Sequence, residues 1–208
     1  MKKLFLLGIL SLAISFANAQ EGLKGTWFVG GQLAFGSDKK HVDGVEHKLT
    51  NTTVLPILGT FITPSVAVGA GLGYMGDKTE VADADYSKGS NFVIKPLVRK
   101  YWNINGGLFF FGQLAAPVMF GNKKTYPEYQ EMKSNTSSAY LELSPGFDYV
   151  INSWMTIETS FKIFSTGFSR VKPKNGDADT SFSFNANPFN SVGDRTVGEL
   201  QVGVKFLF

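Results

Sequence analysis

The sequence contains no cysteine and only two histidines among its 208 residues. Without cysteine the fold has no disulfide, and no lipid can be attached to a cysteine at a processed N-terminus. Two histidines leave little material for a metal centre or a hydrolytic triad. Beyond the first residues no run of 18 consecutive apolar residues occurs, so helical membrane spans are excluded.

An excess of charge of one sign is also missing. The chain has 20 basic and 17 acidic residues, and the basic count falls to 18 when Lys2 and Lys3 are set aside with the N-terminal segment. Nucleic-acid binding needs a clustered basic surface, so we expect no nucleic-acid partner.

The N-terminal segment has the composition of an export signal. Two lysines precede the apolar run from Leu4 to Ala17, and Ala17-Asn18-Ala19 supplies small residues for cleavage after Ala19. The sequence therefore predicts a signal peptide over residues 1–19, export by the Sec pathway, and a mature domain over residues 20–208.

A strict alternation of polar and apolar residues stands out at the C-terminus. Its apolar face carries Leu200, Val202, Val204, Phe206 and Phe208. The opposite face carries Glu199, Gln201, Gly203 and Lys205. A period of two residues is that of a β-strand. The 23 glycines and 19 phenylalanines also suit a barrel wall in lipid.

Similar runs bounded by turn residues recur along the chain and predict eight strands. Their ranges are 25–36, 49–62, 66–76, 91–103, 107–120, 137–151, 155–167 and 196–208. The predicted fold class is all-β, an eight-stranded antiparallel up-and-down transmembrane β-barrel. An even number of strands puts both ends of the barrel domain on the periplasmic side.

The links between these strands alternate between short and long, which orients the barrel. Short turns belong in the periplasm and long loops outside the cell, which makes 37–48, 77–90, 121–136 and 168–195 the outer loops. Trp27, Trp102 and Trp154 then map to one periplasmic aromatic rim. Residues 180–187 alternate as well, and we interpret them as a β-extension above the membrane.

Residues 59–74 and 144–149, together with the Phe-terminated last strand, carry a resemblance to a known group. The chain resembles the outer-membrane protein β-barrel domain family, porin-like small barrels of OmpA and OmpX architecture. The resemblance implies a location in the outer membrane of a Gram-negative bacterium and insertion by the barrel-assembly machinery through the C-terminal strand. It implies little about activity.

Charged residues of both signs fall on the predicted inward faces of the strands. An eight-stranded barrel is narrow enough for side chains to fill, so these charges should pair as an interior ion-pair cluster. Its members are Lys95, Arg99, Glu142, Asp148, Glu158, Lys162, Glu199 and Lys205. A gated narrow pore whose pairs rearrange is the alternative.

The fifth predicted strand is apolar on both faces, so either Phe109 and Phe111 pack inside or part of the interior is an apolar cavity. Prolines 56, 96, 117 and 145 fall inside predicted strands, where a missing N–H weakens the ladder. Bulges would accommodate them, and a lateral opening for an apolar ligand is the alternative.

We expect a non-enzymatic, monomeric outer-membrane protein with no cofactor and no metal, whose partners are membrane lipid and lipopolysaccharide. A narrow channel or carrier is the second hypothesis. A lipid-modifying enzyme using His41 or His47 is the third. Loop carboxylates could also bridge a divalent ion to lipopolysaccharide, although they lack the spacing of a calcium loop: Asp77, Glu80, Asp83, Asp85, Asp177 and Asp179.

Overall fold

The structure is a computed structural model that describes residues 23–42, 44–82, 84–126, 132–174, 176–186, 191–192, 195–196 and 201–208. The predicted signal peptide, Glu199 and Leu200 lie outside these ranges. No helix in the described residues is long and apolar enough to cross a membrane. The described chain is all-β and antiparallel, which confirms the predicted class.

Thirteen strands follow one another along the described chain. They are β1 (Trp27–Val42), β2 (Val45–Thr63), β3 (Val66–Val81), β4 (Ala84–Asn105), β5 (Leu108–Ala115), β6 (Val118–Thr125), β7 (Met132–Asn152), β8 (Met155–Ser160), β9 (Phe164–Pro173), β10 (Asp179–Asn185), β11 (Ser191–Val192), β12 (Arg195–Thr196) and β13 (Gln201–Leu207).

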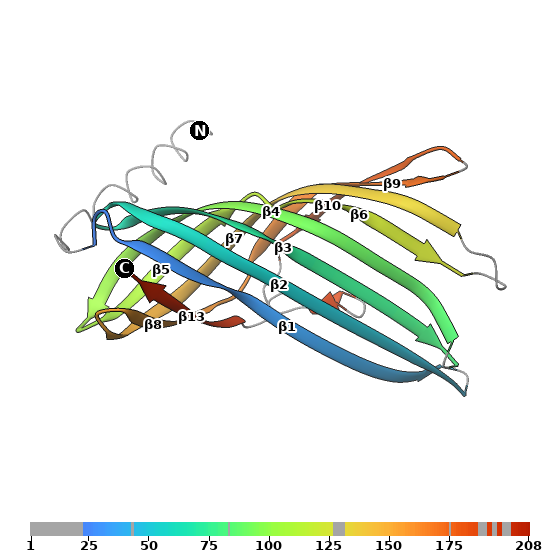
Figure 1. Cartoon of the computed structure of the whole chain (residues 1–208), viewed down its shortest axis with the longest axis horizontal. Coiled ribbons are helices and arrows are strands. Elements are labelled where there is room, and N and C mark those ends of the chain that lie inside the picture. Colours follow the sequence, from blue (N-terminus) through green and yellow to red (C-terminus); the bar gives the residue numbers. More distant parts are fainter. Residues whose placement is uncertain are drawn as a thin grey trace.

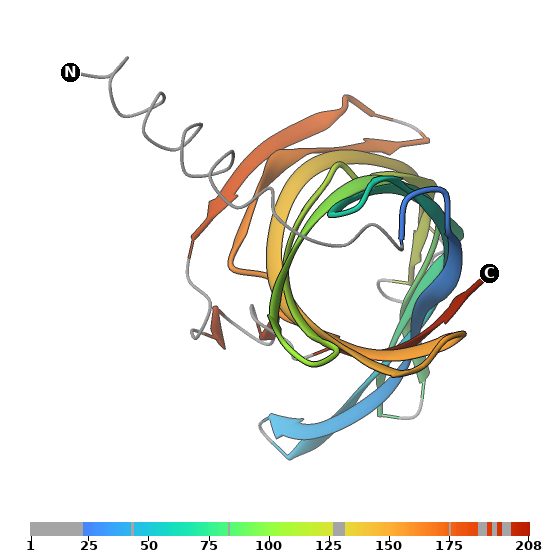
Figure 2. The same ribbon diagram turned by 90° about the vertical axis from the view of Figure 1, so that its left-hand side faces the viewer.

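Eleven of these strands form one sheet that closes on itself (Figures 1 and 2). Backbone pairing runs from β1 through β2, β3, β4, β5, β7, β8 and β13 and returns to β1. Between β1 and β13 the ladder has two residue pairs, Phe28 with Leu207 and Val29 with Phe206. Trp27 and Phe208 add two backbone hydrogen bonds of 2.8 and 3.0 Å. Beyond Val29, β1 pairs only with β2 among the described residues, so the sheet closes only near Trp27 and Phe208.

The predicted count of eight strands is wrong, and two local features explain the difference. The predicted strand 107–120 is divided into β5 and β6 at Ala116-Pro117, where proline cannot donate to the ladder. β5 and β6 keep one register against β7, because Ala115 pairs with Glu142 and Val118 with Ala139.

The predicted strand 155–167 is divided into β8 and β9 at residues 161–163. Gly146 pairs with Ser160 whereas Leu143 pairs with Phe164, so one extra residue enters on the β8–β9 side. This is the pattern of a β-bulge, and it lies opposite Pro145.

Three predicted outer loops also prove to be largely strand. β1 and β2 continue to a tight turn between Val42 and Val45, and β3 and β4 to one between Val81 and Ala84. β7 likewise begins at Met132, inside the predicted loop 121–136. Backbone pairing persists there although both faces are polar, so the alternation that predicts a strand is lost before the strand ends.

The segment predicted as a β-extension is β10, which pairs with β9 from Asp179 to Asn185. Phe182 lies 5.1 Å from Phe168 and Phe184 lies 5.4 Å from Phe164, measured between ring centroids. β10 therefore extends the apolar outward face of β9 and does not stand clear of it.

The two faces of the wall differ sharply in composition. Outward positions are apolar and exposed over most strands, as at Leu72, Phe92, Leu114 and Phe147. Inward positions are buried and form an aromatic and aliphatic core with Phe28, Phe61 and Tyr101 among its members. The turn between β4 and β5 needs Gly106 and Gly107, whose φ angles are +58° and +128°.

Candidate functional site

The structure brings seven of the eight predicted interior charges into ion pairs inside the barrel. Glu199 lies outside the described residues. The other seven come from β4, β7, β8 and β13 and from the bulge between β8 and β9: Lys95, Arg99, Glu142, Asp148, Glu158, Lys162 and Lys205.

Arg99 is the most highly connected of these residues. Its Nη1 and Nη2 donate to the two carboxylate oxygens of Glu158 at 2.6 and 3.1 Å. Its Nε donates to Oε1 of Gln113 at 2.7 Å. A guanidinium matched to a carboxylate by two parallel bonds is fixed in orientation as well as charge. The contact bridges β4 and β8, which share no backbone pairing.

Lys205 of β13 joins the same network from another part of the wall. Its ammonium binds the Asp148 carboxylate, lies 3.7 Å from Glu158 and donates to the Tyr101 hydroxyl at 3.2 Å. Lys205 and Asp148 are only 1% and 3% exposed. Burial at this level requires a partner for each charge.

A second group of charges lies along β4 and β7. On β4 it is represented by Lys95, which is four residues from Arg99 and on the same face. Glu142 accepts from Lys95 and from Lys162, each at 3.1 Å. Lys162 lies in the β8–β9 bulge, so the bulge places its ammonium at the wall where Glu142 is available. The seven charges thus form two connected groups.

An aromatic layer closes the interior next to these charges. Phe28, Phe61, Tyr101 and Phe111 form a chain of rings with centroid separations of 5.9, 5.3 and 5.6 Å. Arg99 lies 4.9 Å above the Phe111 ring and Lys205 lies 5.1 Å from Tyr101. Such cation–π contacts bind the two layers together.

Most of this layer is not predicted from the sequence. Of the two alternatives for Phe109 and Phe111, packing inside is confirmed, because their side chains are 4% and 0% exposed. Phe28, Phe61 and Tyr101 are not among the predicted site residues. The alternation of residues along the strands could have revealed them, since Tyr101 lies on the inward face of β4 together with Lys95 and Arg99.

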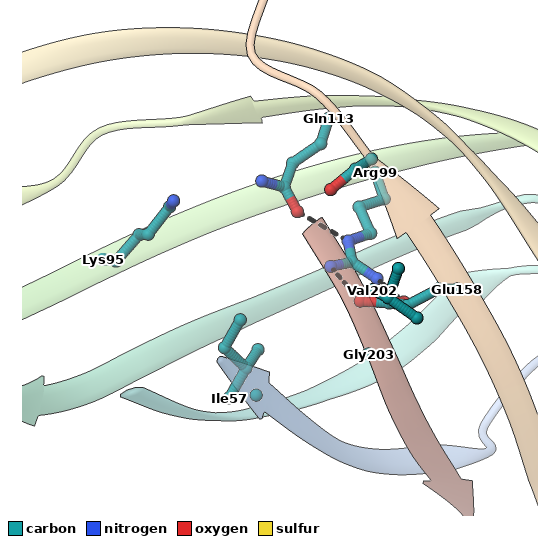
Figure 3. A pocket seen from close by; sticks show the side chains of 9 residues that line it. Ile57, Lys95, Arg99, Gln113, Glu158, Val202 and Gly203 are labelled. Carbon is teal, nitrogen blue, oxygen red and sulfur yellow. Dashed lines mark hydrogen bonds and ion pairs between the residues drawn. The ribbon is translucent and has the colours of Figure 1, made fainter. Parts of the chain in front are cut away.

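A small cavity lies beside the Arg99–Glu158 ion pair. It has a volume of about 20 Å³ and is lined by Gly31, Ile57, Lys95, Arg99, Gln113, Glu158, Ser160, Val202 and Gly203. Figure 3 shows the Arg99 guanidinium between Gln113 and Glu158, with Lys95 apart from them. That volume holds roughly one water molecule.

The other predicted site residues lie on the outside of the barrel. Val202, Val204, Phe206 and Phe208 are exposed on one face of β13 and the segment after it. Trp27, Trp102 and Trp154 lie at the end of the barrel that holds the β2–β3, β4–β5 and β7–β8 turns. Trp102 contacts Phe110, and Trp154 stacks on Phe206 at 6.0 Å.

The polar residues of the outer hairpins make ion pairs of their own. Lys78 and Lys48 approach the Glu80 carboxylate at 2.6 and 3.3 Å. The hydrogen bond from Lys78, followed by that from Lys48, lowers the pKa of Glu80 below its ordinary value. Glu80 is thus engaged by lysines.

The two histidines lie in the β1–β2 hairpin. His41 lies opposite Glu46 and His47 opposite Lys40 in the β1–β2 ladder. Asp83 and the side chain of Asp85 lie outside the description. Among the residues that the structure describes, no three His, Cys, Asp or Glu side chains are grouped to hold a metal ion.

Comparison with known structures identifies a similar fold. The outer membrane protein OprG from Pseudomonas aeruginosa matches 92% of this chain and 99% of its own, with a TM-score of 0.53 and 13% sequence identity. No protein-family model and no curated protein sequence matches. The fold is therefore that of an outer-membrane β-barrel protein, and the likeness to OmpA and OmpX stays a prediction.

Proposed function

We propose that this protein is an integral outer-membrane β-barrel with a non-enzymatic role. Its interior is plugged, and its hairpins present a surface outside the cell. The observation that carries the proposal is the filling of the interior by two stacked layers, one of ion pairs and one of aromatic rings.

The outward face supports the location in a membrane. Aliphatic and aromatic side chains cover it on most strands, which would be unfavourable in water but suits hydrocarbon. The fold shared with OprG points to the same compartment. The two ends of the barrel also differ, because one carries three tryptophans and at the other the β1–β2 and β3–β4 hairpins continue as polar strands.

Filling of the interior supports a scaffold in preference to a conductor. Ion pairs cross the interior and link Arg99, Glu158, Lys205 and Asp148. Beside them lie the rings of Phe28, Phe61, Tyr101 and Phe111. A pore needs a continuous water column past both layers. The cavity beside the Arg99–Glu158 pair has room for about one water.

Planar-bilayer recording tests this proposal directly. Purified protein should be electrically quiet. Phe111→Ala should produce leak currents because it removes a ring from the interior layer. Phe110→Ala is the matched control, since its ring contacts Trp102 and Phe147 on the other face. Steady, resolved conductance steps from the unmutated protein would overturn the plugged interior.

A narrow carrier is the second candidate, and the seam between β1 and β13 favours it. The small interior cavity reaches Gly31 of β1 and Gly203 of β13, where the ladder between these strands has ended. A small polar solute could enter the wall there if β13 separates from β1. Uptake of solute into liposomes without ionic current would favour this candidate over the scaffold.

Export is part of the same proposal. Cleavage after Ala19 would leave a mature chain that begins at Gln20, and the assembly machinery would recognise the apolar face of the C-terminal strand. Mass spectrometry of protein from outer-membrane fractions tests the cleavage site. A mature protein that retains Met1 would contradict it.

A further inference from the structure

Five lysines lie side by side across the wall, far from the end that carries Trp27, Trp102 and Trp154. Lys78 pairs with Lys88, Lys88 with Lys124, and Lys124 with Lys133 in successive ladders. The Lys174 amide continues this register with a 2.9 Å hydrogen bond to the Lys133 carbonyl. We call these five residues the lysine row. The outer ends of their strands lie at the right of Figure 1.

The lysine row belongs to the outward face of the barrel. Residues directly opposite each other in an antiparallel ladder share a face. On β4 the buried inward positions are Ser87, Val93 and Lys95, whereas Lys88 and Phe92 are exposed on the other parity. The ladder pairs of Lys88 therefore face outward with it.

Composition changes in steps along this face, from apolar to cationic. One line of paired residues is Ile94, Val118, Ala139 and Phe168, and the next is Phe92, Phe120, Ser137 and Arg170. Then come Ser90, Asn122, Asn135 and Lys172, and finally the lysine row. The six-residue step from Ile94 to Lys88 covers about 20 Å along β4. Hydrocarbon, interface and headgroup region of a bilayer follow one another in this order.

Part of this positive charge has no carboxylate partner among the described residues. Lys78 shares Glu80 with Lys48. In the described part of the chain, Lys88, Arg170, Lys172 and Lys174 take part in no ion pair. None of the outward positions in the four lines above is Asp or Glu. Such a surface attracts anions.

A hollow next to the lysine row adds shape to the charge. It has a volume of about 390 Å³ and is lined by Phe120, Gly121, Asn135, Thr136, Ser137, Arg170 and Lys172. A guanidinium and an ammonium can bind a phosphate there. The amide and hydroxyl groups suit sugar hydroxyls, and the Phe120 ring continues into the apolar face.

We propose that the lysine row, Arg170 and Lys172 form a docking surface for a phosphorylated glycolipid of the outer leaflet. The proposal rests on the outer-membrane location proposed above. Five strands span about 19 Å at the usual strand spacing, so the surface suits a ligand with more than one phosphate. Its apolar continuation suits acyl chains, which a free anion lacks.

Native mass spectrometry of the folded mature chain in detergent micelles tests the proposal. The probes are diphosphoryl lipid A and the same lipid with both phosphates removed. The unmutated protein should prefer the phosphorylated lipid. Lys88→Gln with Lys172→Gln should weaken its binding by about tenfold or more.

The control variant combines Lys24→Gln with Lys123→Gln. It also removes two charges from exposed side chains, but Lys24 lies at the opposite end and Lys123 has the inward parity of β6. Its binding should match that of the unmutated protein. Equal loss in both variants would make the effect one of net charge and overturn the docking surface.

Two further results would also overturn it. One is equal binding of the dephosphorylated lipid, and the other is displacement of lipid A by excess inorganic phosphate, which would indicate a site for a free anion. Insertion is scored separately by resistance to carbonate extraction from liposomes. Protein that inserts without preferring the phosphorylated lipid contradicts this inference alone, whereas extracted protein contradicts the proposed function.

Discussion

Arg99 on β4 holds both carboxylate oxygens of Glu158 on β8, at 2.6 and 3.1 Å. These strands exchange no backbone hydrogen bond, so the side chains alone join them across the interior. Gln113 and Tyr101 occupy further donors of the guanidinium. The barrel is therefore braced from inside as well as closed around its circumference.

Arg99→Ala should lower the free energy of unfolding by about 3–5 kcal/mol, because it leaves the Glu158 carboxylate buried without its main partner. Urea unfolding in detergent micelles measures the change. Changing Arg99 and Glu158 together to Met should cost less than Arg99→Ala alone. Lys24→Ala, at an exposed position, is the control. A loss for Arg99→Ala as small as the control would contradict the bracing role.

Val98→Arg should destabilise the protein by about 2–4 kcal/mol, since Val98 faces outward at the middle of the apolar part of β4 and would place a charge in hydrocarbon. Tyr86→Arg is the matched control, because Tyr86 has the same parity on the same strand near the outer turn. It should cost about 0–1 kcal/mol. Unfolding in lipid vesicles compares the two. Equal tolerance would mean that this face does not contact lipid.

Gly59→Ala should cost about 1–3 kcal/mol by overpacking. A Cβ at Gly59 would overlap the ring of Phe28 and lie 2.6 Å from the Val68 carbonyl oxygen. Gly36→Ala on β1 is the control, since nothing lies within 4 Å of its Cβ position. Unfolding midpoints measure both. Equal midpoints would show that Phe28 can leave the aromatic layer freely.

Glu80 should titrate below the ordinary range of a glutamate. Its pKa is lowered by the hydrogen bond from Lys78 and then by that from Lys48. The contribution of Glu80 to folding stability is therefore complete above its unfolded-state pKa. That contribution is lost as the pH falls through the lowered value. A carboxyl-carbon NMR titration follows the residue. Lys78→Gln should raise the pKa, whereas a Glu80 pKa above the ordinary value in the unmutated protein would contradict the contact.

Parity along the strands made much of the wall predictable from the sequence. Lys95, Arg99 and Tyr101 alternate with Ile94, Val98 and Trp102, and a strand with two different environments requires such a pattern. The bulge at residues 161–163 could not be predicted in this way. Pro145, which lacks an N–H, lies opposite the bulge on β7, so the sequence of residues 161–163 alone does not reveal it.

The outer hairpins were harder to predict because their two faces have similar polarity. Lys39 and Glu46 pair across the β1–β2 ladder at 2.7 Å, yet neither residue marks a strand by itself. The aromatic layer posed the opposite difficulty. Phe28 and Phe111 lie inside and Phe110 outside, and hydrophobicity alone does not distinguish the two sides of a lipid-facing wall.

The short ladder between β1 and β13 also governs how the molecule can fold. Val29 and Phe206 meet across 177 residues of chain, whereas the neighbouring hairpins close over short turns. Contacts of such long range form late, because their loop-closure entropy is compensated only when the intervening strands are in place. Until then the growing sheet carries two unpaired edges that can recruit other chains. Closure of the seam between β1 and β13 covers these edges only near Trp27 and Phe208, because β1 beyond Val29 keeps β2 as its one partner among the described residues.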